Sequence, residues 1–403
     1  MELFWLEHKK LWRKKIVKIC VLLCFVYCVI FGSILSFQWF CFGSSDDYTS
    51  AFGNNFDGYT VIKDSQEYAL SFGGELTDET LQQIVSDYQQ MEADGMEEEL
   101  EKTDWQIVNS WLGTLYPELR DTGNYKTMIS YVDPDKLTGF YERRQQVLDE
   151  FLEVSGQVGA EKEYLHQIDG KVEKPFHYEW VEGWSTLLGS MVADLGVVMA
   201  LFLGIVLSSL FAGEWHDNTS TLVLTTRNGW GKIALAKILT GLAFTVELFA
   251  LLAVSSVISQ LFFMGTAGWN MPIQNIKLIA VAPMNMLQAE IYEYAFVLLG
   301  AIGFAGIVMF ISAAVKNNVL TLLLSLAVVY GPMMIAEYLP YGMQKALDLI
   351  PLVGSSTDIF RTNTFRIFGK LIWSPYLLII IPVLIGILCM PFAIKSWSRR
   401  MKA

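Results

Sequence analysis

The residues whose chemistry stands out are carboxylates inside apolar stretches of the chain. Asp194 and Glu247 each lie within a run of apolar side chains long enough to cross a membrane, and Glu290 and Glu293 stand at the start of another. A charge in the hydrocarbon core of a bilayer is costly, so a carboxylate there is a functional candidate by default. For Asp194 and Glu247 two interpretations stay open: a polar path or gate, or a structural hydrogen bond between helices.

The other carboxylates of this kind are expected near the ends of their spans. Glu290, Glu293 and Glu337 fall where water is close, so ordinary interfacial side chains are the simpler interpretation. An intramembrane enzyme that used Glu290 and Glu293 with Asp194 would need the three carboxylates at similar depth. Their positions in the apolar stretches argue against such an enzyme.

Hydrolytic and metal chemistry have no recognisable motif in the sequence. Gly229-Trp-Gly-Lys232 lacks the spacing and the hydroxyl residue of a phosphate-binding loop, and neither His-Glu-x-x-His nor Gly-x-Ser-x-Gly occurs. Cys20, Cys24 and Cys28 share one helical face in an apolar run with no histidine nearby, so we expect packing residues rather than metal ligands. We therefore predict no catalytic residue, cofactor or metal in this chain.

The most informative segment is 212–232, between two apolar stretches. Glu214 stands at its start, Asn218 and Thr219 can cap a short helix, and Leu222 lies on an apolar ridge. The remaining polar features follow the ridge and are Thr225, Thr226, Arg227 and, in the next apolar stretch, Lys237. An amphipathic helix with an apolar ridge and polar ends at a membrane surface suits the docking of a soluble partner.

These residues must be positioned by helices that cross a membrane. Hydrophobic residues make up 53% of the 403 and charged residues only 17%, below the roughly 25% of soluble domains. A crossing helix needs about 20 mostly apolar residues. Six stretches meet this length, and we predict an all-α polytopic membrane protein with transmembrane helices at 16–40, 187–211, 233–264, 292–315, 319–339 and 374–394.

Positive charge predicts which side of the membrane each loop occupies. Lysine and arginine gather before the first span, in 212–232, in the turn at Lys316 and in the tail 395–403, which all fall on one side. By the positive-inside rule that side is the cytoplasm. Both termini are then cytoplasmic, although Arg361, Arg366 and Lys370 in the loop 340–373 oppose the rule. Residues 1–15 form an amphipathic pattern that predicts a helix in the lipid headgroup layer.

The segment 41–186 differs from the rest in charge. It holds 30 acidic against 10 basic residues, a net charge of −20, whereas the remainder is net +8. Apolar residues at helical spacing begin at Leu81, Trp105 and Leu137, so a mostly helical extracellular domain is expected, followed by a second outer loop at 265–291. The acidic balance argues against nucleic acid as a partner, because phosphate binding needs clustered cations.

The segment that begins at Glu214 resembles the pattern of ABC-2 type exporter permeases. In that family a glutamate, a threonine, leucines, a second threonine and a basic residue form a coupling helix that sits in a cleft of the ATPase subunit. The resemblance covers residues 1–40 and 185–403, with a large outside insert between the first two spans. It implies that the ATPase-coupling residues are Glu214, Thr219, Leu222, Thr225 and Arg227.

The resemblance implies a permease subunit of an ABC exporter in a plasma membrane, of bacterial type. Its partners would be a cytoplasmic ABC ATPase, which holds ATP and magnesium, a second permease copy or homologue, and membrane lipid. An alternative from another class is a membrane sensor or assembly scaffold whose outside domain binds a ligand without transport. The sequence leaves the transported substrate open.

Overall fold

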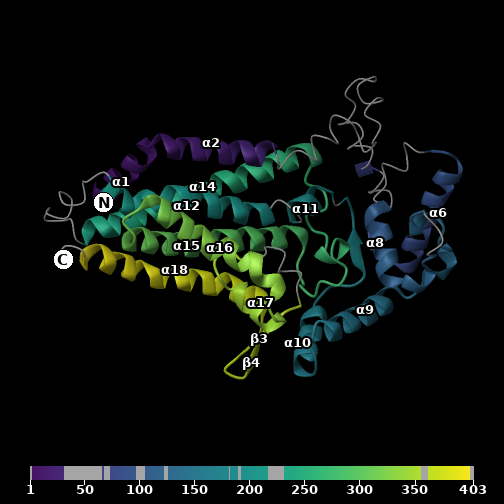
Figure 1. Ribbon diagram of the computed structural model, residues 1–403. Coiled ribbons are helices and arrows are strands. Elements are labelled where there is room, and N and C mark those ends of the chain that lie inside the picture. Colours follow the sequence, from purple (N-terminus) through teal and green to yellow (C-terminus); the bar gives the residue numbers. More distant parts are fainter. Residues whose placement is uncertain are drawn as a thin grey trace, which may run out of the picture.

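Long parallel and antiparallel helices form one half of the molecule, and a smaller helical domain forms the other. A computed structural model of the chain describes residues 2–30, 66–67, 73–96, 105–121, 126–180, 182–188, 192–216, 231–354 and 362–399. Figure 1 shows the long helices side by side, with both chain ends at the pole opposite the smaller domain. We call these poles the terminal end and the domain end of the bundle.

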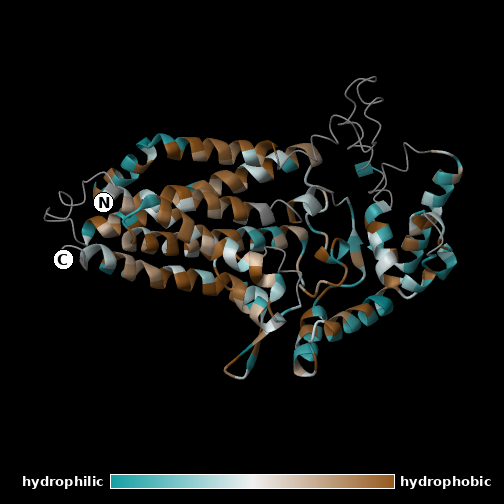
Figure 2. Cartoon of the chain, viewed as in Figure 1, coloured by the Kyte–Doolittle hydropathy of each residue, from teal (hydrophilic) through white to brown (hydrophobic). Residues whose placement is uncertain are grey.

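In the described part of the chain, five helices are long and apolar enough to cross a membrane. They are α12 (Val192–His216), α14 (Lys232–Met264), α15 (Met286–Ala314), α16 (Asn318–Ile335, extended by a 3-10 turn to Tyr338) and α18 (Ser374–Arg399). In Figure 2 the ribbons of these helices are coloured hydrophobic over most of their length, whereas hydrophilic residues are frequent in the smaller domain. In a bilayer only a helix satisfies its own backbone polar groups, so these five helices indicate an all-α multi-pass membrane protein.

Two helices precede the first of these spans. Helix α1 (Glu2–Arg13) packs against α14, and α2 (Lys15–Ile30) runs along α14 after a break at Lys14. The first expected span, 16–40, is therefore described only as far as Ile30. Cys20, Cys24 and Cys28 are all buried on one face of α2, among apolar neighbours.

Several helix bounds differ from the expected spans. Helix α12 covers 192–216 where 187–211 was expected, and α15 begins at Met286, six residues before the expected start at Tyr292. A reciprocal cap explains the earlier start of α15: Asn285 Oδ1 accepts from the backbone N–H of Gln288, and the Gln288 side chain accepts from the N–H of Asn285. Such a pair satisfies donors that a helix start leaves unpaired.

The closest helix contact in the bundle is the crossing of α15 and α18. Gly303 and Gly306 of α15 face Pro382 and Gly386 of α18. A Cβ atom at Gly306 would lie 2.4 Å from the carbonyl oxygen of Gly386. Small residues let membrane helices approach at backbone distance, where packing supplies most of their attraction.

Among its described residues, the smaller domain has four α-helices of ten residues or more and a two-stranded sheet. The helices are α6 (Asp78–Ala93), α8 (Trp105–Leu115), α9 (Phe140–Val154) and α10 (Ala160–Asp169), and β1 (Gly74–Leu76) pairs antiparallel with β2 (Phe176–Tyr178). The apolar stripes expected at Leu81, Trp105 and Leu137 lie on or beside the first three. Short 3-10 turns at Pro117–Leu119, Met128–Ser130 and Pro134–Lys136 lie between α8 and α9, and α11 (Glu182–Thr186) leads toward α12.

The domain shares its core with the connection between α14 and α15. Met271, Ile273 and Leu278 of that connection belong to the same buried cluster as the domain helices. Trp111 Nε1 of α8 donates to the carbonyl of Asn275, in a 3-10 turn at Ile273–Asn275, at 2.9 Å. The segment expected as a separate outer loop is thus an integral layer between domain and bundle.

The chain between α16 and α18 carries the last elements. They are α17 (Tyr341–Leu347) and a hairpin of β3 (Thr364–Ile367) and β4 (Lys370–Trp373). Helix α18 begins at Ser374, directly after β4, and the hairpin projects to the side of the bundle (Figure 1).

Candidate functional site: a charged cluster between α1 and two spans

Helix α1 is amphipathic and lies along α14 at the terminal end of the bundle. Its apolar face buries Leu11 completely, and the Trp12 ring meets the Phe244 ring of α14 edge-on at 5.8 Å between centroids. Its other side carries Lys9, Lys10 and Arg13. A helix with this pattern is expected at a membrane surface, and here one face of it is covered by a span.

Four charged side chains join α1 to two spans in a cluster that we call the Glu214 cluster, formed by Glu7, Lys10, Glu214 and Lys237. Lys10 Nζ of α1 lies 2.5 Å from Glu214 Oε1 of α12. Lys237 Nζ of α14 lies 2.8 Å from the same oxygen and 2.8 Å from Glu7 Oε2 of α1. The formal charges of the four groups balance.

Burial makes the Glu214 cluster energetically sensitive. The Glu214 side chain is 3% exposed and the Lys237 side chain 2%. A buried ion pair contributes little net stability, but removing one partner leaves a buried charge uncompensated and costs about 3–5 kcal/mol. The buried Glu214–Lys237 pair therefore favours α12 and α14 keeping their relative positions, and α1 adds Glu7 and the half-exposed Lys10 to this contact.

A second polar contact reinforces the attachment of α1. Trp12 Nε1 donates to Glu247 Oε2 at 3.0 Å, and His8 Nε2 lies 3.2 Å from Glu247 Oε1. Glu247 thus reaches from α14 to the N-terminal helix, and its carboxylate is about 42% exposed. Of the two interpretations of Glu247, this geometry supplies contacts for the structural one.

Aromatic contacts at the terminal end also connect α12 to α18 and to the turn between α15 and α16. Phe211 of α12 meets the Trp397 ring of α18 at 5.5 Å, and Trp397 in turn meets Trp215 at 6.1 Å. Lys316, in the turn between α15 and α16, lies 4.5 Å from the centroid of the Trp215 ring. A cation over an indole face is attractive, so this turn is also connected to the end of α12.

The structure describes some of the predicted site residues, whereas others lie outside the described part of the chain. Glu214 is in the last turn of α12, immediately before 217–230, and Thr219, Leu222, Thr225 and Arg227 lie in that segment, outside the described residues. Asp194 is in the first turn of α12, at the opposite end from Glu214, and its side chain is outside the described part. Asp194 and Glu247 belong to different helices, and no contact between them is described.

Two carboxylates that were expected near the water boundary, Glu290 and Glu293, are buried within the protein. Glu290 and Glu293 are 4% and 0% exposed and lie in the first two turns of α15, so both are buried within the protein near that end of the helix. Nearby, the hydroxyls of Tyr294 on α15 and Ser256 on α14 lie 2.8 Å apart. Carboxylates buried in a span are costly and mark functional positions by default.

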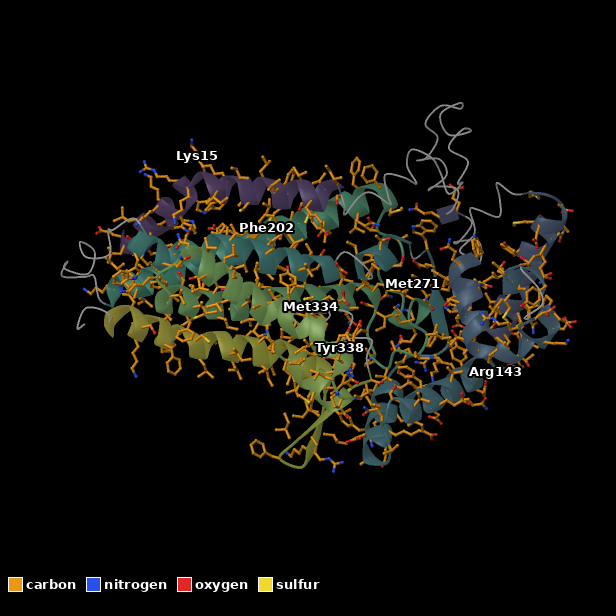
Figure 3. All side chains as sticks on the ribbon, viewed as in Figure 1. Lys15, Arg143, Phe202, Met271, Met334 and Tyr338 are labelled. Atoms are coloured by element: carbon orange, nitrogen blue, oxygen red, sulfur yellow. The ribbon has the colours of Figure 1, made fainter. Side chains whose placement is uncertain are left out.

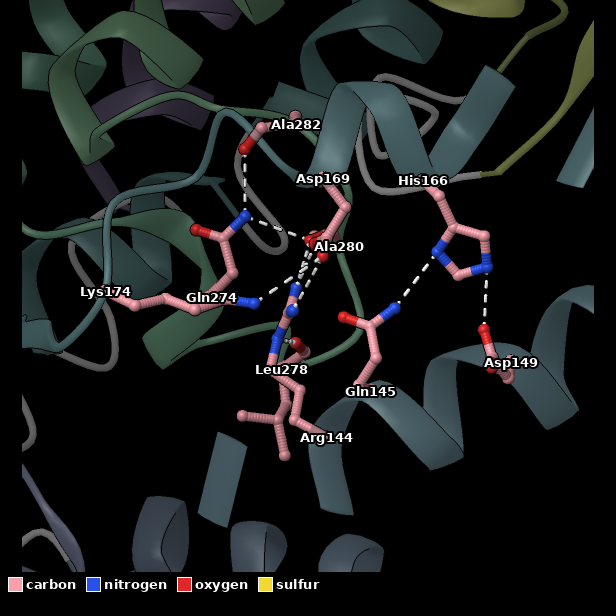
Figure 4. Close-up of polar contacts among 10 residues, drawn as sticks. All are labelled: Arg144, Gln145, Asp149, His166, Asp169, Lys174, Gln274, Leu278, Ala280 and Ala282. Atoms are coloured by element: carbon pink, nitrogen blue, oxygen red, sulfur yellow. Dashed lines mark hydrogen bonds and ion pairs between the residues drawn. The ribbon is translucent and has the colours of Figure 1, made fainter. Parts of the chain in front are cut away.

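The domain end has its own buried ion pair, which the sequence did not reveal. Arg144 of α9 donates to both carboxylate oxygens of Asp169 of α10, at 2.6 and 3.2 Å, and to the carbonyls of Leu278 and Ala280 at 2.7 and 3.0 Å. Figure 4 shows the guanidinium between α10 and the 278–282 segment. Arg144 thus joins the domain to the connection that leads into α15.

Long sequence separation explains why these partners were missed. Lys10 and Glu214 are 204 residues apart, and Arg144 and Leu278 are 134 apart. One local signal did exist: Glu7 and Lys10 stand at i, i+3, a spacing that puts both on one face of α1.

No group of three or more histidine, cysteine, aspartate or glutamate side chains among the described residues could hold a metal ion. No protein-family model, no curated protein and no solved structure matches this chain.

Proposed function

We propose that this chain is the membrane-spanning permease subunit of an ABC exporter. It moves a substrate across the plasma membrane with ATP hydrolysed by a separate cytoplasmic ATPase, which holds ATP and magnesium. Two permeases, either two copies or this chain with a homologue, work with two ATPase subunits. This chain itself binds neither cofactor nor metal.

In this proposal the chain crosses a bacterial plasma membrane six times. The first span continues α2 to about residue 40, so that the 73–188 domain lies outside and the terminal end lies in the cytoplasm. The basic residues at the terminal end support this orientation, since Lys10, Lys14, Lys316 and Lys395 all belong to it.

The observation that carries the proposal is the position of the Glu214 cluster. Glu214 is three residues before 217–230, the segment that resembles a coupling helix, and it is held by α1 and α14 through Lys10 and Lys237. A partner that pushes on 217–230 would act on α12 through Glu214. Because the buried Glu214–Lys237 pair must stay together, α14 would follow, and α1 is attached to this pair through Lys10 and Glu7.

The same geometry suggests how ATP binding could move the spans. Closure of the ATPase pair displaces 217–230, and the bundle shifts between two arrangements as packed helices rather than by bending one helix. Trp215 and Lys316 carry this displacement to the turn between α15 and α16. In this mechanism Glu214 acts as a positioning residue inside the junction, and Leu222 is the residue that faces the ATPase.

Co-purification tests the docking segment. The tagged chain is purified from its own membranes, and magnesium-dependent ATP hydrolysis in the eluate reports the partner. We expect Leu222→Asp to abolish the co-purified activity, while Val154→Asp retains it, because Val154 is on the domain surface and 89% exposed. Equal ATPase activity with both variants would place the partner elsewhere.

A sensor or assembly scaffold is the second candidate. It is favoured by the core that the domain shares with 271–289 and by the Arg144 contact to the same connection, because a ligand on the domain could reach α15 through them. Under this alternative the wild-type chain carries no ATPase through purification. That one result separates the two functions.

A further inference from the structure

The tip of the hairpin before α18 carries a phenylalanine whose presence is not explained by packing within the chain. Strands β3 and β4 pair from Thr364 with Trp373 to Ile367 with Lys370, which leaves Phe368 and Gly369 as a two-residue turn. Both turn residues have positive φ, 49° and 79°. Turns of this kind favour Asn-Gly, and a bulky side chain is uncommon there.

Phe368 is also fully exposed. Its relative exposure is 103%, the highest among the exposed large hydrophobic residues of the described part. An aromatic ring in an unfavourable backbone conformation, with its whole surface in solvent, gains nothing from the fold. The reason for a phenylalanine at this position therefore lies in a surface outside the chain.

The base of the hairpin is rigid, so the tip is presented in a fixed place. Trp373 is 1% exposed at the end of β4. Thr364 at the start of β3 is held from two sides: its Oγ1 donates to Gln157 Oε1 at 2.9 Å, and its carbonyl accepts from Lys345 Nζ at 2.6 Å. The hairpin is thereby fastened to the domain and to α17.

The hairpin tip points to the region where the lipid surface must be. In Figure 1 the hairpin projects sideways from the domain end of α18, and its tip lies level with the outer part of that helix rather than beyond it. Tyr376 in the first turn of α18 is 54% exposed, and Tyr338 at the end of α16, labelled in Figure 3, is 85% exposed. Exposed tyrosines at the ends of spans are typical of the membrane–water boundary.

The charged residues beside the tip indicate which component of the membrane boundary it contacts. Arg366 and Lys370 flank the tip, one on each strand and both exposed, and the Arg366 side chain keeps 60% of its surface in solvent beside Glu161 at 3.8 Å. Apolar tips with basic flanks insert into the headgroup layer and place their cations on lipid phosphate. These are also two of the three residues that oppose the positive-inside rule, and a lipid contact accounts for them.

We propose that the β3–β4 hairpin is a lipid-binding element of the leaflet on the domain side. The Phe368 ring inserts at the boundary between headgroups and acyl chains, and Arg366 and Lys370 bind the phosphates of anionic phospholipids. The domain end of α18 is thereby held at the lipid surface. This inference requires only that the spans cross a bilayer, and it does not depend on an ATPase partner.

Photo-labelling from lipid tests the inference on the full chain. The protein is reconstituted in nanodiscs of phosphatidylcholine and phosphatidylglycerol with a phospholipid that carries a diazirine near the headgroup, and adducts are mapped by mass spectrometry. We expect adducts on the peptide that contains Phe368 and none on the peptide that contains Met96, which is 40% exposed and follows α6 at the side of the domain away from the bundle (Figure 1). Phe368→Asn should lower hairpin labelling several-fold, and it suits the turn because asparagine tolerates positive φ.

The charged flanks are tested in the same discs. The double variant Arg366→Glu with Lys370→Glu should reduce labelling in anionic discs to the level found with phosphatidylcholine alone. The internal control is the exposed face of α18 at Ile387 and Leu388, 50% and 64% exposed, which must label in every sample. Labelling at α18 without labelling at the hairpin overturns the inference, and so does a hairpin cross-link to a second copy of the chain in place of lipid.

Discussion

The Nζ atom of Lys237 on α14 lies 2.8 Å from Oε1 of Glu214 on α12, and both side chains are almost completely buried. The same lysine also reaches Glu7 of α1, so one cation serves carboxylates from two helices. We expect Lys237→Met to lower the free energy of unfolding by about 3–5 kcal/mol, because it removes the buried cation that contacts the buried Glu214 carboxylate and the partly buried Glu7 carboxylate. Thermal unfolding in detergent, followed by scanning fluorimetry, measures the loss.

The matched control for this variant is Lys232→Met, at the exposed start of the same helix. It should leave the unfolding midpoint unchanged. The double variant Glu214→Gln with Lys237→Met removes one charge of each sign and should recover part of the loss. If Lys237→Met unfolds like the wild type, the cluster does not hold these helices together.

Arg144 and Arg143 are adjacent on α9 but differ in their surroundings, which makes them a matched pair. Arg144 is buried on Asp169 and two carbonyls, whereas the Arg143 side chain is 31% exposed beside Glu118. Arg144→Met should cost about 3–5 kcal/mol, and Arg143→Met about 1 kcal/mol or less. Hydrogen exchange at residues 277–282 should rise in the first variant only. Equal exchange in both would mean that Arg144 does not connect the domain to this segment.

The crossing of α15 and α18 predicts opposite effects for two glycine substitutions. Gly306→Ala places a Cβ 2.4 Å from the Gly386 carbonyl, so the two backbones must separate, at a cost of about 1–3 kcal/mol. Gly196→Ala in α12 meets nothing within 4 Å and should stabilise by roughly 0.5–1 kcal/mol, since alanine restricts the unfolded chain more. Unfolding midpoints of the two variants measure this difference. A tolerated Gly306→Ala would mean that the helices are not in backbone contact.

The sequence predicted the elements whose signals are local. The apolar run of α14 is bounded by Gly231 and Gly265, and its observed limits differ from the expected ones by a single residue. The start of α15 carried a readable signal as well, because Asn285 and Gln288 have the spacing of a reciprocal cap that marks a helix start before the long apolar run. Periodicity and capping act over a few residues, and they can be read from a single chain.

The partners of the site residues could not be predicted in the same way. Glu214 and Glu247 were singled out from the sequence, but the contacts that α1 makes with them come from more than two hundred residues earlier. The i, i+3 spacing of Glu7 and Lys10 puts both on one face of α1, but nothing local shows that Glu214 contacts that face. The shared core of domain and 271–289 was missed for the same reason, since amphipathic stripes show which face is buried and not what covers it.

Tyr116 and Tyr141 predict a loss of stability in alkaline solution. Burial, followed by the nearby Asp78 carboxylate, raises the pKa of Tyr116 from 10.0 to about 12, against the opposing effect of Arg143. Burial likewise raises the pKa of Tyr141 to about 12. A folded pKa above the unfolded one gives stability that is complete below about pH 10 and is lost as the pH rises toward 12. Unfolding midpoints should fall across that interval.

The two tyrosines differ in hydrogen bonding, which separates their variants. Tyr141 Oη donates to the Leu76 carbonyl at 2.7 Å and accepts from the Phe176 N–H at 2.6 Å, whereas Tyr116 Oη has no partner among the described residues. Tyr141→Phe should therefore destabilise at neutral pH by about 1–3 kcal/mol, and Tyr116→Phe should be neutral or stabilising. Both variants should reduce the loss of stability that the wild type shows in alkaline solution. A destabilising Tyr116→Phe would show that its hydroxyl is bonded.

The most direct test of the permease proposal identifies what touches Leu222 in living cells. A photo-reactive phenylalanine analogue at position 222 cross-links its neighbour, and the adduct is sequenced by mass spectrometry. The matched position is Val154, on the exposed surface of the domain. We expect position 222 to form an adduct with a soluble ATPase that contains a Gly-x4-Gly-Lys-Ser/Thr loop. Position 154 should form no such adduct. An adduct only with lipid, or with a protein that lacks this loop, would contradict the proposal.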